Sequence, residues 1–467
     1  MVRTHHTVII GLALLALAAC TTQVPSPGTS PSPNAAWVPP ASVERPASAG
    51  RQEPTGGLKP AAPLGEGPLS LAAIIDVALA NNPDTRAAWL EARAAEAGVG
   101  SERADFYPQV DVLASATRSR SAAQGASSST TIAPSVALTY LLFDFGGRDA
   151  RVEQARQTLI AADFAHNSTI QDVVLRVQQV YYALLDAKAL LDAQQSTIKE
   201  RRANLDAAEA RHSAGVATIA DVLQARTAFS QAELTREPIE GNLRTIEGTL
   251  STVMGLPATT RFEIGALPAE VPAKQVSDSV ESMIAGAVAK RPELGSARAA
   301  AERARARVQE VRAQGMPSIN AVASAGQTFL GGLDARTTPY SAGIALRFPL
   351  FTGWRNTYDI RRAETEVQIA EEDVRGLEQQ IGLQVWTSYF ALQTAAQRLA
   401  TSRDLLASAQ ESANVAAERY RAGVGNIIDL LTAEAALESA RAQEVQARAD
   451  WFVSVAQLAH DTGSLTK

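Results

Sequence analysis

Residues 148–214 decide the fold, and they read RDARVEQARQTLIAADFAHNSTIQDVVLRVQQVYYALLDAKALLDAQQSTIKERRANLDAAEARHSA. The stretch holds 67 residues without a glycine or a proline, the two residues that most disfavour a helix interior. At 1.5 Å per residue, a continuous helix of this length measures roughly 100 Å. Helices of globular proteins average about 11 residues, so the stretch predicts a rod and not a helix of an ordinary compact domain.

Apolar side chains recur at every seventh position of this rod. The column comprises Ile170, Val177, Leu184, Leu191, Ile198 and Leu205. A sustained seven-residue period keeps one face turned toward a partner helix and winds the pair into a left-handed supercoil. We therefore expect a coiled coil along most of the rod. A surface helix of a globular bundle is the alternative, and the length disfavours it.

Composition and charge exclude several classes of protein. The 467 residues carry 43 basic and 49 acidic side chains, for a formal net charge of −6, so the chain has no positive excess with which to bind nucleic acid. Beyond the N-terminal region only His166, His212 and His460 remain, and their spacing fits no metal motif. No nucleophile elbow or phosphate-binding loop is found. We expect no enzyme activity, no cofactor and no metal.

The N-terminal segment has the features of an export signal. Its apolar run, Val8 to Leu17, is too short to span a membrane as a mature helix, so residues 1–19 are predicted to be a signal peptide. Leu17-Ala18-Ala19-Cys20 resembles a bacterial lipobox, which implies cleavage before Cys20 and its acylation. Thr21, in place of Asp, implies sorting to the outer membrane. An ordinary signal peptide with an incidental cysteine is the alternative.

Two segments after the first helical region change from a helical period to a period of two. Val110, Val112, Ala114 and Ala116 alternate with Gln109, Asp111, Ser115 and Thr117, and a similar alternation returns in residues 135–142. Strands of about ten residues with one apolar face fit a membrane-spanning sheet. A half-buried hairpin of a soluble protein is the alternative for these strands taken alone.

The chain repeats itself after 208 or 209 residues. Arg211-His212-Ser213-Ala214-Gly215-Val216 returns as Arg419-Tyr420-Arg421-Ala422-Gly423-Val424, and the strand pairs and the long helical stretch return with nearly the same shift. Each half is therefore predicted to be a helix, two strands, a very long helix, a tight turn and a returning helix. Four strands cannot close a sheet in lipid, where free edges are forbidden, so we expect several chains to share one barrel.

These features divide the chain into consecutive parts. After the signal peptide come residues 20–68, an acylated cysteine followed by a Pro-rich tether that cannot bury a core. The first repeat occupies residues 69–257 and the second occupies residues 277–463. Residues 258–276 link the two repeats, and residues 464–467 form a short tail.

The combined pattern resembles one known family. A lipobox, a tandem repeat with strand pairs, and Arg-x-x-Ala-Gly-Val-x-x-Ile-x-Asp-x-Leu at the end of each rod resemble the TolC family of outer membrane efflux channels. The resemblance covers about residues 69–463. It implies an α+β membrane protein: a homotrimer with a long antiparallel coiled-coil tunnel and one shared transmembrane β-barrel, to which each chain contributes four strands.

The family resemblance also assigns roles to the turns between the long helices. Gly215, Val216, Gly423 and Val424 are then the hairpin tips that contact a periplasmic adaptor, and glycine suits a helix that must stop and reverse. Asp429 and Asp221 are candidate gate residues at the closed mouth of the tunnel. Each acid also fits a cap at a helix start, and a cap is favoured for Asp221. Thr432 stands where some members carry a second acid, so a doubled acidic ring is not expected.

Aromatic side chains lie at the two points where a predicted strand is followed by a long helix. They are Phe143, Phe145, Phe351 and Trp354. Such residues suit the aromatic girdle at a membrane interface. Simple packing at the junction is the alternative.

The sequence thus predicts a lipid-anchored outer membrane channel of a tripartite efflux system. It would export small molecules, with a periplasmic adaptor and an inner-membrane transporter as partners and outer membrane lipid around its strands. Adaptor docking would untwist the helices at the tips and open the channel. The exit duct of a type I protein secretion system is the first alternative. A periplasmic coiled-coil adaptor or scaffold is the second.

Overall fold

The structure is a computed structural model that describes residues 28–39, 67–120, 128–269, 271, 279–331 and 336–465. The predicted signal peptide, Cys20 and much of the predicted tether lie outside these residues. The chain divides into two compact units. The sheet unit includes Glu91–Ala162 and Arg298–Glu371, and the helical unit comprises Ser30–Leu90, Asp163–Ala297 and Glu372–Lys467.

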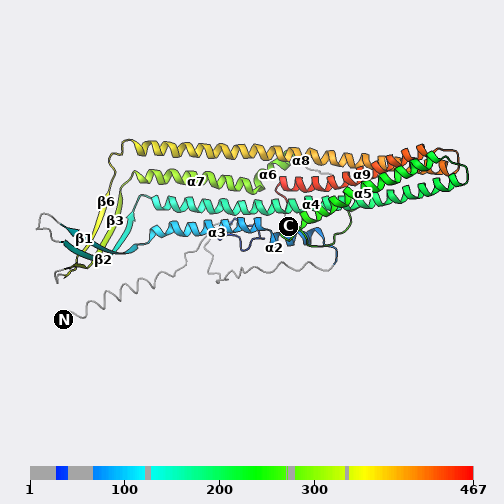
Figure 1. Cartoon of the computed structure of the whole chain (residues 1–467). Helices are drawn as coiled ribbons and strands as arrows, with labels where there is room; N and C mark the ends of the chain where they lie inside the picture. The colour runs from blue at the N-terminus through cyan, green and yellow to red at the C-terminus, as the bar shows by residue number, and fades with distance from the viewer. Residues whose placement is uncertain are drawn as a thin grey trace. The chain divides into compact units, whose positions relative to one another are not determined.

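The sheet unit contains all the strands of the described chain, and Figure 1 shows the longer ones lying side by side. They are β1 (Gln109–Arg120), β2 (Ser128–Phe143), β3 (Ser318–Gly326), β4 (Thr328–Gly331), β5 (Arg336–Thr337) and β6 (Tyr340–Arg347). β1 pairs with β2, β2 with β3, and β3 with β6, all antiparallel. β4 continues β3 along β2 in the same register, and β5 pairs with β4. The four predicted strands are therefore present, with the second pair interrupted.

The register collects apolar side chains on one face of this sheet. Val112 lies opposite Val136, which lies opposite Ala325 on the next strand. The alternate face carries mainly polar or small residues, as in the row Asp111, Ala137 and Ser324, with Leu113, Leu141 and Val322 as its larger apolar members. Further members of the apolar face are Val110, Leu138, Tyr140, Ala321, Ala323, Ile344 and Leu346. Side chains alternate across a strand, so the period of two in the sequence becomes this two-faced sheet.

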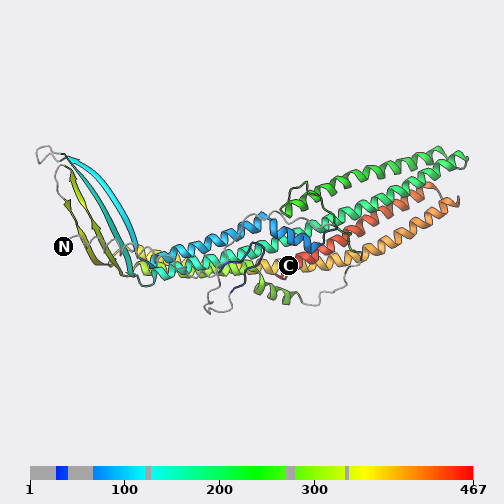
Figure 2. The ribbon, with the colours of Figure 1, turned by 90° about the horizontal axis from the view of Figure 1, so that it is seen from below.

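Both edges of the sheet are free in the single chain. Among the described strands, β1 pairs only with β2, and β6 pairs only with β3. Every residue of β1 and of β6 is exposed, including Val112 and Ile344, each about three-quarters exposed. Long apolar edge strands invite further pairing. Figure 2 shows the strands bowed in one direction. Such curvature is expected of a sheet that further strands would extend into a closed barrel.

The helices recur in the two halves with nearly equal lengths. The short helices are α2 (Leu71–Asn81), α3 (Pro83–Arg103), α6 (Val280–Lys290) and α7 (Pro292–Gln314), and a single turn η1 (Ala104–Phe106) precedes β1. The rods α4 (Gly147–Ser213) and α8 (Arg355–Arg421) have 67 residues each. The returning helices α5 (Ile219–Val253) and α9 (Ile427–Asp461) have 35 residues each. The tandem repeat is thus confirmed, and Figure 1 shows the two resulting hairpins, α4–α5 and α8–α9.

The helical unit has its main core around α2, α4 and α5. Ile74, Leu79, Leu184, Leu250 and Met254 are almost fully buried there. Leu184 belongs to the predicted heptad column, so that column faces other helices, as predicted. The core includes residues of more than one partner helix. None of the helices in the described ranges combines the length and apolar character needed to cross a bilayer.

Residues 30–39 pack on the helical unit, which differs from the predicted tether. Trp37 is 8% exposed, and its ring meets the ring of Phe164 edge-on at 5.3 Å. The backbone N–H of Trp37 donates to Asn167 Oδ1, and Asn167 Nδ2 donates to the Trp37 carbonyl, both at 2.7 Å. His166 Nε2 bonds the carbonyl of Pro33 at 2.9 Å, and burial lowers the pKa of His166. One large aromatic residue thus anchors a segment whose composition suggests no packing.

Candidate functional site

The turns at the ends of the two rods have the same backbone geometry. Gly215 and Gly423 have φ values of 74° and 78°, in the left-handed region where glycine is favoured. In the first turn Val216 N–H donates to the Arg211 carbonyl at 3.0 Å, and Gly215 N–H donates to the His212 carbonyl at 2.9 Å. The second turn repeats both bonds. This is a Schellman motif, which ends each long helix at its glycine.

Apolar side chains project from both turns. Val216 is 65% exposed and Val424 is 70% exposed. Ile219 and Ile428, in the first turns of the returning helices, are also more than half exposed. Exposed aliphatic side chains gathered at a hairpin end are typical of a protein-docking surface. Val216 and Val424, with Gly215 and Gly423, are the residues predicted to be the adaptor-contact tips, whereas Ile219 and Ile428 were not in that prediction.

Asp221 caps the start of α5. Its carboxylate accepts from the backbone N–H of Thr218 at 2.9 Å, and Thr218 Oγ1 accepts from the Asp221 N–H at 3.3 Å. The two bonds form a capping box, which satisfies two backbone donors of the helix end. The carboxylate of Asp221 is therefore engaged locally.

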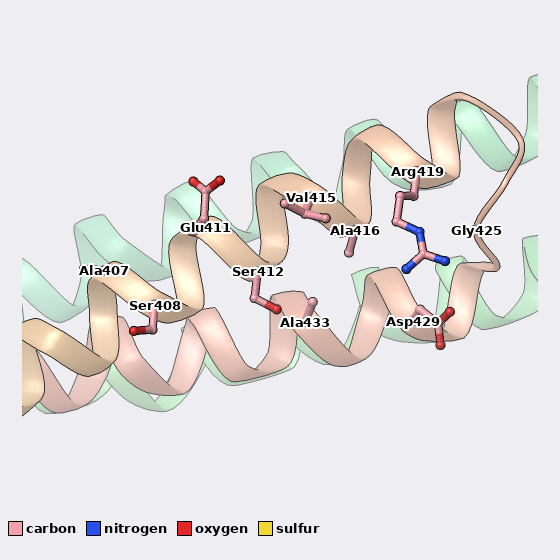
Figure 3. Close-up of a pocket in the computed structure, with 10 residues that line it drawn as sticks. All are labelled: Ala407, Ser408, Glu411, Ser412, Val415, Ala416, Arg419, Gly425, Asp429 and Ala433. Atoms are coloured by element: carbon pink, nitrogen blue, oxygen red, sulfur yellow. The ribbon is translucent and has the colours of Figure 1, made fainter.

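Asp429 occupies the equivalent position of α9 with a different arrangement. The cap is Asn426, whose side-chain oxygen accepts from the Asp429 N–H at 2.8 Å. The Asp429 carboxylate is exposed and makes no hydrogen bond or ion pair within the described ranges. It lines a groove of about 750 Å³ between α8 and α9. Figure 3 shows Arg419 extending from α8 toward the turn of α9 that carries Asp429.

A link between the two rods at their tips was not predicted from the sequence. Arg211 NH1 donates to the carbonyl of Tyr420 at 2.9 Å, and the guanidinium lies 4.9 Å from the centre of the Tyr420 ring. Tyr420 is 6% exposed. Burial raises the pKa of Tyr420, the Arg211 charge opposes this, and the Asp221 charge adds to it. Arg211 and Tyr420 both lie in the repeated tip motif, which was the signal available for this contact.

The predicted interface aromatics lie in pairs where strand meets rod. Phe143 contacts Phe145 with ring centres 4.8 Å apart, and Phe351 contacts Trp354 at 6.2 Å. All four are exposed, from 48% for Phe143 to 76% for Phe351. Phe145 and Trp354 both have positive φ, of 54° and 66°, a strained conformation for such side chains. A shift of 208 residues pairs Phe145 with Gly353 and Gly146 with Trp354, and all four have positive φ, so the turn occurs in both repeats with its aromatic residue displaced by one position.

Arg148, at the first of these junctions, is a buried residue whose role was not predicted from the sequence. Its NH1 donates to the carbonyl of Leu141 at 2.6 Å and to that of Asp105 at 3.2 Å. Its guanidinium lies 4.7 Å from the centre of the Phe106 ring, and an ion pair joins it to Asp144 at 3.6 Å. One side chain therefore connects the end of β2, the turn η1 and the start of α4.

Charged side chains join α4 to α9 in the helical unit. Arg201, 5% exposed, pairs with Glu434 at 2.7 Å, and Arg441 binds Glu200 through two contacts of 2.9 Å. Further along, His460 bonds Asp172 at 3.0 Å. Burial alone would lower the pKa of His460, but its hydrogen bonds to Asp172 and Asp461 raise it to about 9. The imidazole is therefore charged at neutral pH.

Asp186 on α4 differs from these paired residues, because the charge near it, that of Asp450 on α9, has the same sign as its own. Burial, and then the nearby charge of Asp450, raise the pKa of Asp186 to about 6. Its folded pKa lies above the value of 3.8 for a free aspartate, so the ionised carboxylate destabilises the folded chain. The cost is absent below pH 3.8, grows as the pH rises, and is complete above pH 6.

Asp186→Asn is accordingly expected to stabilise the protein at neutral pH. The shift corresponds to about 3 kcal/mol, and partial exposure reduces this to about 1–2 kcal/mol. Chemical unfolding followed by circular dichroism should show the gain at pH 7.5 and none near pH 4. Asp192→Asn, at an exposed position on the same helix, is the control and should change stability by less than about 0.5 kcal/mol. An equal gain at both pH values would contradict this assignment.

No group of three or more His, Cys, Asp or Glu side chains is placed to hold a metal ion within the described part of the chain. The candidate site is thus a pair of hairpin tips and the groove beside Asp429.

Comparison with known families now identifies the architecture. The sequence profile described as "Outer membrane efflux protein" matches residues 74–256 and residues 283–464, one segment in each repeat. The chain belongs to the outer membrane efflux protein family. The resemblance to the TolC family, which was predicted from the lipobox, the repeat and the tip motif, is confirmed.

Relatives of this efflux-family chain align along most of their length. Protein CyaE of Bordetella pertussis is 29% identical over 387 residues, which cover 81% of this chain and 80% of CyaE. The toluene efflux pump outer membrane protein TtgC of Pseudomonas putida is 27% identical over 391 residues, which cover 80% of this chain and 78% of TtgC.

The outer membrane protein VceC of Vibrio cholerae, whose crystal structure is known, has a similar fold. It superposes with a TM-score of 0.73 at 21% identity, covering 84% of this chain and 96% of VceC. The match supports the fold, with its paired strands and long helices, over nearly all of the solved protein.

Proposed function

We propose that this protein is the outer membrane channel of a tripartite efflux system, through which small molecules leave the periplasm or the cytoplasm. The observation that carries the proposal is the sheet of the family-matched chain, which has one apolar face and two free edges. Lipid can cover the apolar face, but the edges need strands from other chains. Three copies of a four-stranded sheet would give one closed barrel of twelve strands.

The rest of the chain fits the same assembly. A homotrimer of the paired long hairpins would form a tunnel across the periplasm. The exposed tip residues Gly215, Val216, Gly423 and Val424 would meet a periplasmic adaptor, which in turn binds an inner-membrane transporter. Phe143, Phe145, Phe351 and Trp354 would lie at the membrane interface, where aromatic rings are favoured. Acylation of Cys20 would add a lipid anchor in the outer membrane.

A growth and export comparison tests the proposed function. A strain without the gene should become sensitive to small toxic compounds and retain a fluorescent dye, and the intact gene should restore both properties. The proteins in the culture medium should not change. Loss of a secreted protein with unchanged drug sensitivity would instead support the exit duct of a type I secretion system. No change in either property would contradict both.

Within this channel we assign the gate to Asp429 and a capping role to Asp221. Three exposed Asp429 carboxylates would gather at the closed mouth, whereas the carboxylate of Asp221 is held by Thr218. Asp429→Ala is expected to raise the conductance of the resting channel in a planar bilayer with little change in stability. Asp221→Ala should instead lower the stability of its hairpin by about 0.5–1 kcal/mol, because the capping box is lost. Equal conductance of Asp429→Ala and the native protein would contradict the gate assignment.

A further inference from the structure

The apolar face of the sheet ends in two arginines at the strand end that lies farthest from α4. On β1 the apolar and small side chains of this face, from Val110 to Ala116, are followed on the same face by Arg118 and Arg120. The pairing of β1 with β2 has no register shift, so the alternation of side chains holds as far as Arg120. The two arginines therefore project from the apolar face, about 7 Å apart along the strand.

The part of the chain that the structure describes does not neutralise this pair. Every residue of β1 is exposed, and neither guanidinium makes an ion pair or a hydrogen bond with a described residue. The residues opposite them on β2 are Thr130 and Ser128, which are neutral. The acid of the described strands is Asp111, which lies on the polar face. Two positive charges thus lie together on the outer surface of the sheet.

The other end of the same face has a different chemistry. Towards α4 it meets the exposed aromatic pairs of the two strand-to-helix junctions. The strand arginine at that end is Arg347, which follows Leu346 of the apolar face and therefore lies on the polar face. Aromatic rings suit a membrane interface of any headgroup charge, whereas guanidinium groups favour anions. The two borders of the apolar face are therefore suited to different headgroups.

We propose that Arg118 and Arg120 bind the phosphate groups of lipopolysaccharide, the phosphorylated glycolipid of the outer leaflet. This rests on the proposed function, because the shared barrel turns the apolar face to lipid. With the long helices in the periplasm, the strand ends far from α4 reach the outer leaflet. A guanidinium donates two parallel hydrogen bonds to a phosphate, and such charged pairs are stronger than hydrogen bonds between neutral groups. A trimer would have three equivalent sites.

The length of the apolar face agrees with this placement. On β2 the face runs from Tyr140 to Ile132, which is about 27 Å along the strand. The usual tilt of barrel strands reduces this to about 20 Å across the membrane, which is comparable to the apolar band of about 25 Å in outer membrane barrels. Thr130, the next residue of the face, is polar and lies opposite Arg118. The arginines would therefore lie where hydrocarbon ends and headgroups begin.

The side chains next to the arginines favour a lipid over a free anion. Between Val112 and Arg118 this face of β1 carries only Ala114 and Ala116, and Pro134 lies opposite Ala114. These side chains are small and apolar, so an acyl chain can lie close to the strand while its headgroup meets the guanidinium groups. The surface thus fits a ligand with an anionic head and an apolar tail.

Native mass spectrometry of the full-length, detergent-extracted trimer tests the site. The probe is lipid A, the phosphorylated lipid portion of lipopolysaccharide, and the matched lipid is lipid A without its phosphates. The native trimer should bind up to three lipid A molecules, and it should bind the dephosphorylated lipid at least tenfold more weakly. Arg118→Gln with Arg120→Gln should weaken lipid A binding about 30-fold, or about fivefold for each arginine, and should leave binding of the dephosphorylated lipid unchanged.

Two further variants separate charge and position. Arg347→Gln removes an arginine from the polar face of the same sheet, so its affinity for lipid A should equal that of the native protein. Arg118→Lys with Arg120→Lys keeps both charges but loses the paired hydrogen bonds, so its affinity should lie between those of the native protein and the double glutamine variant. An equal loss in Arg347→Gln would show a general effect of charge and would overturn the site.

Bilayer conductance and light scattering on the same samples distinguish failure of the lipid site from failure of the proposed function. Conducting trimers that bind lipid A and its dephosphorylated form equally would overturn the lipid site and leave the proposed function standing. Full displacement of lipid A by excess inorganic phosphate, or equally tight binding of phosphatidylglycerol, would also overturn the assignment to lipopolysaccharide. Protein that neither forms trimers nor conducts would overturn both.

Discussion

Val136→Arg is expected to prevent the protein from accumulating as an assembled oligomer in the outer membrane, whereas Ala137→Arg is expected to assemble. Val136 lies in the middle of the apolar face, between Val112 and Ala325. Arginine on the lipid side of a membrane sheet costs about 2–4 kcal/mol near the bilayer centre. Three chains would each bear this cost in one barrel, so the effect on assembly is large.

Ala137 is the matched control because it is the next residue on the same strand. Its neighbours across the sheet are Asp111 and Ser324, on the polar face. An arginine there would face water and an aspartate. Membrane fractionation, with gels of unheated samples, measures the outcome. Equal assembly of the two variants, or failure of Ala137→Arg alone, would contradict the assignment of the two faces.

Arg148→Met should cause the second large effect, a loss of about 2–4 kcal/mol in the free energy of unfolding. Methionine keeps most of the apolar side chain but leaves the carbonyls of Leu141 and Asp105 without their charged donor. Hydrogen bonds to charged groups contribute about 1.5–3 kcal/mol each, and a buried ion-pair partner left alone adds to the cost. The junction of β2 with α4 should therefore loosen.

Arg151→Met provides the comparison for this variant. Arg151 lies one turn further along α4 and pairs with Asp105 at 2.8 Å, but its side chain is 31% exposed. Partly exposed ion pairs contribute about 1 kcal/mol or less. Thermal unfolding in detergent, followed by circular dichroism, should rank Arg148→Met well below Arg151→Met. Similar melting temperatures for the two variants would show that Arg148 is not the residue that holds the junction together.

Elements with a local periodic signal could be predicted from the sequence. The rod without glycine or proline, the period of two in the strands and the repeated turn at Gly215 and Gly423 all depend on neighbours in the chain. Each of these elements is present in the structure. The repeat also gave independent support, because two copies of one pattern must obey the same local rules.

Contacts between residues that are distant in the sequence produce no periodic pattern from which they could be predicted. The packing of Trp37 on Phe164 depends on one side chain finding a site more than 120 residues away. The role of Arg148 depends on three segments meeting at a junction. The different environments of Asp221 and Asp429 depend on whether Thr218 or Asn426 precedes them, a small change within an otherwise repeated motif.

The central claim is that several chains build one pore. It follows most directly from the free edges of the sheet, which need strands from other chains. The decisive measurement is single-channel conductance of the purified, detergent-extracted protein in a planar bilayer, with its subunit number determined by cross-linking on the same sample. Discrete conductance steps from a trimer are the predicted result. A monomeric protein that produces no steps would contradict the shared barrel and the function proposed for it.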